Sequence, residues 1–227
     1  MSYISRKLVQ SAIVLGVIGA PVMASAADFA PPPVGKAVPY AAPLHYRWDG
    51  LYVGINGGGG FGNSYWDIAD TNFTVAGWLV GGTIGYNFQF TRFVAGIEAD
   101  FDYADIGGNT LAGGCATTCT MRNRYLGTGR GRFGFALDRL FPYFTAGVAY
   151  GQLEASRTGV ASTTTWRVGY TVGAGLEIAA LDNWTAKAEY LFVDLGKFAC
   201  SPACGAAAGS SADYYVNVIR LGLNYRF

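Results

Sequence analysis

The sequence predicts an all-β fold: an eight-stranded antiparallel up-and-down β-barrel that crosses a membrane. Three observations predict it. The 227 residues include 33 Gly and 15% aromatic residues but only 14% charged residues, which is unusual for a soluble domain. No apolar run in the body of the chain is long enough for a transmembrane helix. Segments with alternating apolar and polar residues recur along the chain, as expected of strands between two different environments.

Residues 1–26 are predicted to be a cleaved secretory signal peptide. Arg6 and Lys7 precede the apolar run Leu8–Ala20, and the small residues Ala24-Ser25-Ala26 follow it, in the order typical of such signals. We expect cleavage after Ala26; the alternative is an uncleaved membrane anchor. Loss of Arg6 and Lys7 changes the formal net charge from +1 to −1, so no global basic field remains that would attract nucleic acid.

Residues 27–47 are predicted to be a Pro-rich periplasmic tether. Five prolines lie among Ala and Val in this segment, with few charges, and this composition favours extended polyproline conformations over helix or strand. His45, the only histidine, lies in the tether. The barrel itself, predicted over residues 48–227, therefore lacks the commonest general base.

Eight strands are predicted, each with one apolar face and one face of Gly, polar or charged residues. They are Trp48–Phe61, Gly77–Phe90, Phe93–Tyr103, Arg124–Phe135, Tyr143–Gly151, Trp166–Ile178, Trp184–Val193 and Tyr214–Phe227. The apolar faces include, in strand order, Leu51 and Ile55, Trp78 and Ile84, Ile97 and Phe101, Tyr125 and Phe133, Phe144 and Val148, Trp166 and Tyr170, Tyr190 and Phe192, and Ile219 and Leu221. The opposite faces include Asn56, Thr83, Asp100, Arg130, Glu177, Lys187, Glu189 and Arg220.

The charged face is expected to point into the barrel. A charge facing lipid at mid-bilayer costs on the order of 2–4 kcal/mol for Arg or Lys, and an eight-stranded barrel has room inside only for side chains. The apolar face then contacts lipid, with Trp48, Trp78, Trp166 and Trp184 near strand ends as interfacial girdles. A soluble lipocalin-like barrel, the alternative, would need the inverse arrangement.

The predicted connections alternate in length. Three are tight turns, at Phe90–Arg92, Leu137–Leu140 and Ala179–Asn183, and four are longer loops, at Gly62–Ala76, Ala104–Arg122, Gln152–Thr165 and Leu195–Asp213. Outer-membrane barrels have short periplasmic turns and long outer loops. An even number of strands then leaves both termini in the periplasm.

Three motifs carry a resemblance to a known family. They are Trp48-Asp49-Gly50-Leu51-Tyr52-Val53-Gly54, Gly81-Gly82-Thr83-Ile84-Gly85-Tyr86-Asn87, and the closing Arg220-Leu221-Gly222-Leu223-Asn224-Tyr225-Arg226-Phe227. The chain resembles the small eight-stranded outer-membrane proteins of the OmpA-like and opacity-protein type, especially the alphaproteobacterial RopB-like members. The resemblance implies a monomer in the outer membrane of a Gram-negative bacterium, in contact with lipid and lipopolysaccharide. It also implies that Tyr225 and Phe227 belong to the signal read by the barrel-assembly machinery.

One set of charged residues is expected to form a network across the lumen. The set comprises Glu98, Asp100 and Asp102 on the third predicted strand and Arg124, Arg130 and Arg132 on the fourth. Sequential strands of an up-and-down barrel are neighbours, so these side chains should form a ladder of charge-assisted hydrogen bonds. The ladder is either a selectivity filter or proton path, or a structural filling in which buried charges are paired.

The four cysteines are predicted to form disulfides in the outer loops. Cys115 and Cys119 lie in the second outer loop, and Cys200 and Cys204 in the fourth. Structural zinc sites usually have two residues between paired cysteines rather than three, and an oxidising compartment favours disulfides. Of the three possible connectivities, we expect pairing within each loop; cross-loop bridges are the alternative.

No catalytic, cofactor-binding or metal site is predicted. Gly57–Gly60 is followed by no Gly-Lys-Ser/Thr and opens no helical pattern, so it is not a phosphate-binding loop. The barrel enzymes that the chain resembles in size generally use a histidine, and the predicted barrel has none. We therefore expect a protein that is not an enzyme and binds no cofactor.

The expected function is structural: a contribution to envelope integrity and to surface properties. The alternatives are a narrow porin for small solutes and a surface adhesin or ligand-binding protein that acts through its outer loops. In the RopB-like family, a mature Ala-Asp terminus is joined to peptidoglycan by L,D-transpeptidases. The resemblance thus implies attachment through Ala27 and Asp28; the alternative is an unmodified linker.

Overall fold

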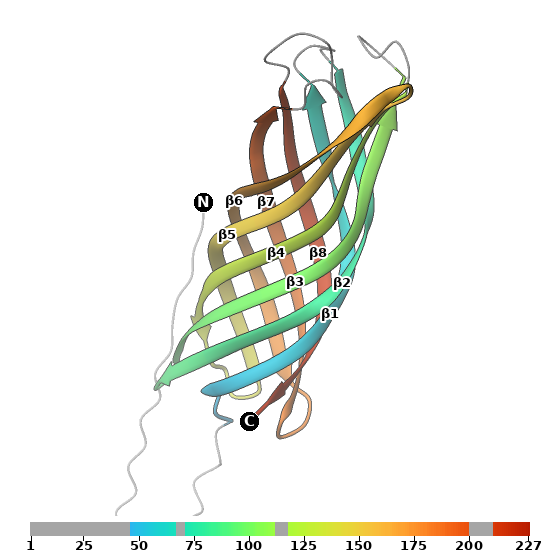
Figure 1. The fold of residues 1–227 in the computed structure, drawn as a ribbon. Helices are drawn as coiled ribbons and strands as arrows, with labels where there is room; N and C mark the ends of the chain where they lie inside the picture. Colours follow the sequence, from blue (N-terminus) through green and yellow to red (C-terminus); the bar gives the residue numbers. More distant parts are fainter. Residues whose placement is uncertain (1–45, 67–70, 112–117, 200–210) are drawn as a thin grey trace, which may run out of the picture. The chain divides into compact units, whose positions relative to one another are not determined.

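The computed structural model describes residues 46–66, 71–111, 118–199 and 211–227, which form a closed antiparallel barrel (Figure 1). Its strands are β1 (Gly50–Trp66), β2 (Thr71–Phe90), β3 (Phe93–Thr110), β4 (Cys119–Phe135), β5 (Leu140–Arg157), β6 (Val160–Ala179), β7 (Trp184–Ala199) and β8 (Ser211–Arg226). Each strand pairs with the next along the chain, and β1 pairs with β8 to close the barrel. The predicted fold class is confirmed. Within the described ranges, no helix is long and apolar enough to cross a membrane.

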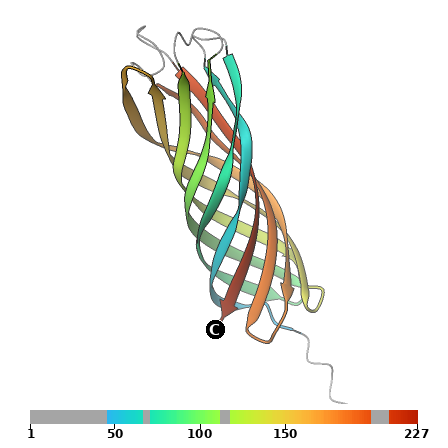
Figure 2. The ribbon, with the colours of Figure 1, turned by 90° about the vertical axis from the view of Figure 1, so that its right-hand side faces the viewer.

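The strands are longer than predicted, because several run far into the expected outer loops. The clearest error is the expected long loop Gln152–Thr165: β5 and β6 continue through it and meet at a two-residue turn, Thr158-Gly159. Gly159 has φ +83°, a left-handed conformation that glycine adopts at little steric cost. The strands have 16 to 20 residues, whereas a membrane crossing needs about 9–11. The long strands seen in Figure 2 therefore exceed the length that one crossing of the hydrocarbon layer needs.

The alternation of faces follows the expected direction over most of the wall. Outward positions carry exposed apolar side chains such as Ile55, Ile97 and Leu221, each 66–67% exposed. Inward positions on the same strands carry buried side chains such as Asn56 and Glu98. In this barrel the outer surface is thus the apolar one, as lipid requires.

The interior contains three layers of buried side chains. The turn-end cap consists of Trp48, Val94, Ala136, Phe141, Tyr143 and Ala179. The ionic layer, next to it, consists of Glu98, Asp100, Asp102, Arg130, Arg132, Glu177, Lys187, Glu189 and Arg220. The apolar layer, toward the outer loops, includes Phe73, Val75, Leu79, Ala104, Ile106, Met121, Leu126, Leu153, Leu191, Val193, Tyr214, Val216 and Val218.

The apolar layer corrects the expectation that the inward face is polar throughout. On β2, the inward positions change from Thr83 in the turn half to Leu79 and Val75 in the loop half. A glycine on β1 leaves space for a large side chain of β3: a Cβ on Gly60 would lie 2.5 Å from Ile106 Cδ1. Large side chains on some strands are therefore matched by absent side chains on another, as close packing demands.

Trp48 also differs from its prediction as a girdle residue. It is 1% exposed and lies in the turn-end cap. Its backbone N–H donates to Gln89 Oε1 at 2.6 Å, and its indole N–H donates to the Asp138 carbonyl at 2.9 Å. Its ring packs against Phe141 with centroids 5.1 Å apart. Tyr46 packs edge-on against Trp48, so the chain entering β1 covers the turn end of the barrel.

We predict that Trp48→Ala lowers the free energy of unfolding by roughly 3–5 kcal/mol, the usual cost of removing a buried large aromatic side chain. Trp78→Ala is the control, because Trp78 is 50% exposed on the outer wall and should cost clearly less. The measurement is urea unfolding of the barrel refolded into lipid vesicles, followed by circular dichroism. Equal losses for the two variants would contradict a capping role for Trp48.

Candidate functional site

The ionic layer is the largest cluster of buried charged groups in the described residues, and the strand register assembles it. Glu98 of β3 lies opposite Arg130 of β4, and Glu189 of β7 lies opposite Arg220 of β8. Because inward positions recur at every second residue, each of these strands delivers its charged side chains to the same depth of the lumen.

Arg130 joins β3, β4 and β7. Its guanidinium donates to Glu98 at 2.5 Å, to Asp100 at 2.8 Å and to Glu189 at 2.9 Å. Its Nε donates to the Thr128 hydroxyl at 2.8 Å, and that hydroxyl donates to Asp100. The carboxylates that accept hydrogen bonds from Arg130 lie on β3 and β7, so this one side chain links opposite walls of the barrel.

Arg220 makes the corresponding links from β8. It donates to Glu189 and to Asp100, each at 2.8 Å, and to Asp102 at 3.1 Å. The side chain is 1% exposed. Asp100 and Glu189 therefore each accept from both Arg130 and Arg220, which closes a ring of charge-assisted hydrogen bonds across the lumen.

Arg132 and Lys187 form the side of the network that faces the turn-end cap. Arg132 donates to Glu177 at 2.5 Å, and its guanidinium lies 4.1 Å from the centroid of the Tyr143 ring. Lys187 donates to Glu98 at 2.8 Å. These contacts combine ion pairing with a cation–π contact, and they connect the ionic layer to the aromatic side chains of the cap.

The structure brings together five of the six residues expected in the network and places the sixth elsewhere. Arg124 lies at the outer wall, where its Nε pairs with Glu154 Oε2 at 2.8 Å and its side chain is 42% exposed. The reason is an irregularity in β4: the pairing with β5 shifts between Asn123 and Tyr125, so Arg124 is an extra residue. A β-bulge reverses which residues point inward, so simple alternation assigns Arg124 to the wrong face.

Four members of the ionic layer were not expected in the network: Glu177, Lys187, Glu189 and Arg220. Alternation places all of them on inward faces of their strands, and this signal is visible in the sequence. Their partners were missed because sequence order predicts only contacts between neighbouring strands, whereas contacts such as Arg130 with Glu189 cross the lumen.

The charges of the ionic layer do not balance, since five carboxylates face four cationic side chains. Asp102 has the weakest support: its ion pair with Arg220 is 3.1 Å long, and its Oδ1 is buried without a hydrogen-bond partner. Asp100 Oδ1 and Arg132 Nε are also buried without a hydrogen-bond partner, but Asp100 pairs with both Arg130 and Arg220, whereas Asp102 pairs with Arg220 alone. No group of three or more His, Cys, Asp or Glu suited to a metal ion occurs in the described part of the chain.

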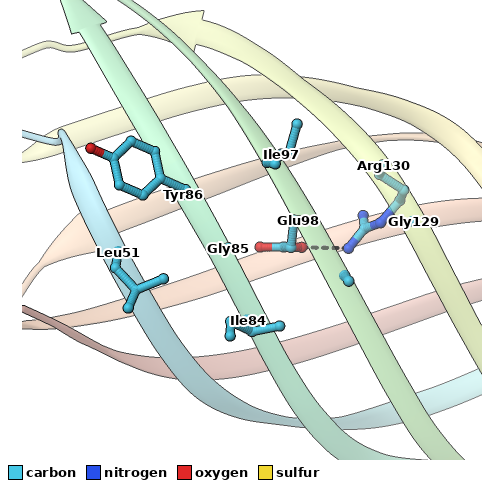
Figure 3. A pocket seen from close by; sticks show the side chains of 9 residues that line it. Leu51, Ile84, Gly85, Tyr86, Ile97, Glu98, Gly129 and Arg130 are labelled. Atoms are coloured by element: carbon cyan, nitrogen blue, oxygen red, sulfur yellow. Dashed lines mark hydrogen bonds and ion pairs between the residues drawn. The ribbon is translucent and has the colours of Figure 1, made fainter.

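A hollow of about 520 Å³ lies beside the ionic layer on the outer wall. Figure 3 shows it with the Glu98–Arg130 ion pair among Leu51, Ile84 and Ile97. These three apolar side chains are exposed on the outside of the barrel. The hollow therefore opens on the apolar outer surface of the barrel.

The structure describes only some of the remaining predicted site residues. Cys119 is buried at the start of β4 and is disulfide-bonded, while Cys115, Cys200 and Cys204 lie outside the described residues, so the connectivity stays a prediction. Ala27 and Asp28 also lie outside them. At the closing strand, the Phe227 N–H donates to the Leu51 carbonyl at 3.0 Å, and Tyr225 packs edge-on against Trp184 and Phe227.

Comparisons with known proteins agree with this architecture. A family model described as the outer membrane protein beta-barrel domain matches residues 12–227. The chain is 34% identical over 215 residues to a 31 kDa outer-membrane immunogenic protein of Brucella melitensis, covering 84% of this chain and 89% of that protein. It is 31% identical over 212 residues to a 25 kDa outer-membrane immunogenic protein of Brucella abortus, covering 89% and 92%. It is also similar to the solved Neisserial surface protein A, with a TM-score of 0.52 and 12% identity over 78% of this chain and 97% of that one, which supports the fold alone.

We predict that Asp102→Asn changes the free energy of unfolding by about 1 kcal/mol or less, because it removes the excess negative charge and keeps the shape of the side chain. Asp100→Asn is the matched control: it breaks contacts with both Arg130 and Arg220 and should cost about 3–5 kcal/mol, as for other buried ion pairs that lose one partner. Urea unfolding in lipid vesicles measures both. A larger loss for Asp102→Asn than for Asp100→Asn would contradict this assignment.

Proposed function

The chain belongs to the outer-membrane β-barrel protein family, and on that premise we propose that it is a structural barrel, closed to solutes, that contributes to envelope integrity and to the properties of the cell surface. It is an outer-membrane protein, as its family and its curated relatives are. One observation carries the proposal of closure. Two consecutive layers of buried side chains, one ionic and one apolar, fill the lumen.

The two layers oppose conduction for different reasons. In the ionic layer, side chains such as Arg130 and Glu189 are 3% exposed and use their donors and acceptors on each other, so an ion would have to displace an existing partner. In the apolar layer, Ile106, Met121 and Leu153 are fully buried, so a hydrated ion would lose its water without compensation. A continuous water path would need both layers to open.

The same contacts favour a role without catalysis. A general acid or base must reach its substrate within hydrogen-bonding distance. The carboxylates of the ionic layer are instead held by Arg or Lys side chains in the closed lumen, as Glu98 is held by Arg130 and Lys187. His45 lies outside the described residues.

We predict negligible single-channel conductance for the purified, refolded protein in a planar bilayer, with an open porin as the positive control. Arg130→Ala should also remain closed, because the substitution empties part of the ionic layer and leaves the apolar layer intact. Stable openings of the wild-type protein, or openings enlarged by Arg130→Ala, would support the narrow porin instead.

Attachment to the cell wall is the second part of the proposal. Cleavage after Ala26 would expose the α-amine of Ala27, whose ordinary pKa near 8 leaves a usable neutral fraction to attack an acyl-enzyme. A polyproline tether of about twenty residues, at roughly 3.1 Å each, would span on the order of 60 Å. The docking of Tyr46 and Trp48 at the turn end of the barrel supports a tether that starts on the periplasmic side.

We predict that muramidase digestion of purified sacculi releases this protein with a muropeptide on the amine of Ala27. Mass spectrometry of the N-terminal peptide measures it, and a variant with Ala27-Asp28 deleted is the control. If all recovered N-terminal peptides begin with an unmodified Ala27, or cleavage falls elsewhere, the tether is only a linker. That result would leave the closed-barrel proposal unaffected.

A further inference from the structure

The outer wall changes character at an aromatic boundary on the loop side of the barrel. The boundary is formed by Tyr103 of β3, Tyr125 of β4 and Trp166 of β6. The rings of Tyr103 and Tyr125 lie 5.7 Å apart, and those of Tyr125 and Trp166 are stacked at 6.3 Å. Tyr and Trp concentrate at the level of lipid headgroups. Because the outer loops are on this side, the boundary marks the headgroups of the outer leaflet.

Two arginines of β4 lie immediately beyond this boundary. Arg122 and Arg124 are placed between Tyr125 and the outer loop that precedes β4, and their side chains are 45% and 42% exposed. The bulge at Arg124 brings it to the outer wall. A feature that looks like an error in the strand pattern thus places a second guanidinium at the headgroup level.

Each arginine is anchored by a carboxylate through one edge only. Arg124 Nε pairs with Glu154 at 2.8 Å, and Arg122 Nε pairs with Asp105 at 3.4 Å. The terminal Nη groups of both arginines have no hydrogen-bond partner among the residues that the structure describes. The acidic residues therefore hold each guanidinium in place and leave the donors at its tip available.

The space beside these donors is hollow and polar. A hollow of about 200 Å³ is lined by Thr120, Arg122, Arg124, Glu154 and Ser156. A second one of about 250 Å³ shares Thr120 and Arg122 with it. Glu154 and Asp105 also line these hollows, but each is already paired with one of the arginines. Hydroxyl groups next to guanidinium donors suit a phosphate group, whose oxygens accept several hydrogen bonds at once.

From these observations we infer that Arg122 and Arg124 bind the phosphate of a phosphorylated glycolipid in the outer leaflet. The aromatic boundary places a headgroup phosphate at the height of the two arginines, and the neighbouring rings contact the acyl chains and sugar below it. Asp105 and Glu154 cancel the long-range field of the pair. The site thus depends on a ligand that the membrane itself delivers, rather than on attraction of anions from solution. This inference is independent of whether the barrel is closed.

The experiment uses the full mature chain refolded in detergent, lipid A as the probe, and the same lipid A after phosphatase treatment. Native mass spectrometry measures the affinity for each. We expect the wild-type protein to prefer the phosphorylated form by about tenfold or more, the effect of one charge-assisted hydrogen bond. Arg122→Gln combined with Arg124→Gln should abolish the preference. Arg139→Gln should keep it, because Arg139 is an exposed arginine that pairs with Asp182 at the other, turn end of the barrel.

Further arms make the result specific to the guanidinium contact. Arg122→Lys combined with Arg124→Lys should fold as the wild type does and retain part of the preference, which separates loss of binding from misfolding. Equal binding of the two lipid forms by the wild type, or loss of the preference in Arg139→Gln, would overturn the inference. Loss of the preference on chelation of divalent cations would replace it with a cation bridge through Asp105 and Glu154. Saturation by inorganic phosphate alone would show a site for free anions.

Discussion

The narrowness of an eight-stranded barrel is the constraint on which the rest of this structure depends. The interior has room only for side chains, and charged groups placed there must be paired within the protein. Arg130 and Arg220 meet this requirement by sharing Asp100 and Glu189 between them. Because these four side chains come from four strands, the ionic layer holds those strands in one register, and a slip of one residue on any of the four would leave a buried charge unpaired.

The apolar layer serves a different purpose from the ionic layer. Apolar side chains contribute burial without directional contacts, so they tolerate imperfect registers that buried ion pairs do not. Their position in the loop half, where the pairing of β4 with both neighbours shifts, is consistent with this tolerance. The bulge disturbs the wall in the half whose interior packs through Ile106 and Met121, and the ionic layer in the other half keeps its regular alternation.

Alternation in the sequence predicts the strands well where the two faces differ in polarity, and it fails where both faces are apolar or where the strand is irregular. In β3, the contrast between Phe101 and Asp102 is clear, and the inward face is assigned correctly. In the loop half, Leu79 and Val80 are both apolar although one is buried and the other lipid-facing, so hydrophobicity alone does not distinguish lumen from membrane. Arg124 was misassigned because a bulge changes the phase of the strand without any Gly or Pro to mark it. Trp48 was misassigned because a tryptophan before a strand suits an interface as well as a cap.

The two ends of the barrel are built for different surroundings. At the turn end, Trp48 fixes the incoming chain to Gln89 and Asp138, so a pull on the tether would act on a packed cap rather than on the edge of β1. At the loop end, the strands continue past the aromatic boundary with charged and hydroxyl side chains on their outer face, among them Arg122 and Glu154. The closed interior separates these ends, because the side chains of both layers are buried in the lumen. Changes in the outer loops or in the tether can therefore alter what the barrel contacts on either side while the ionic layer, which defines the fold, remains the same.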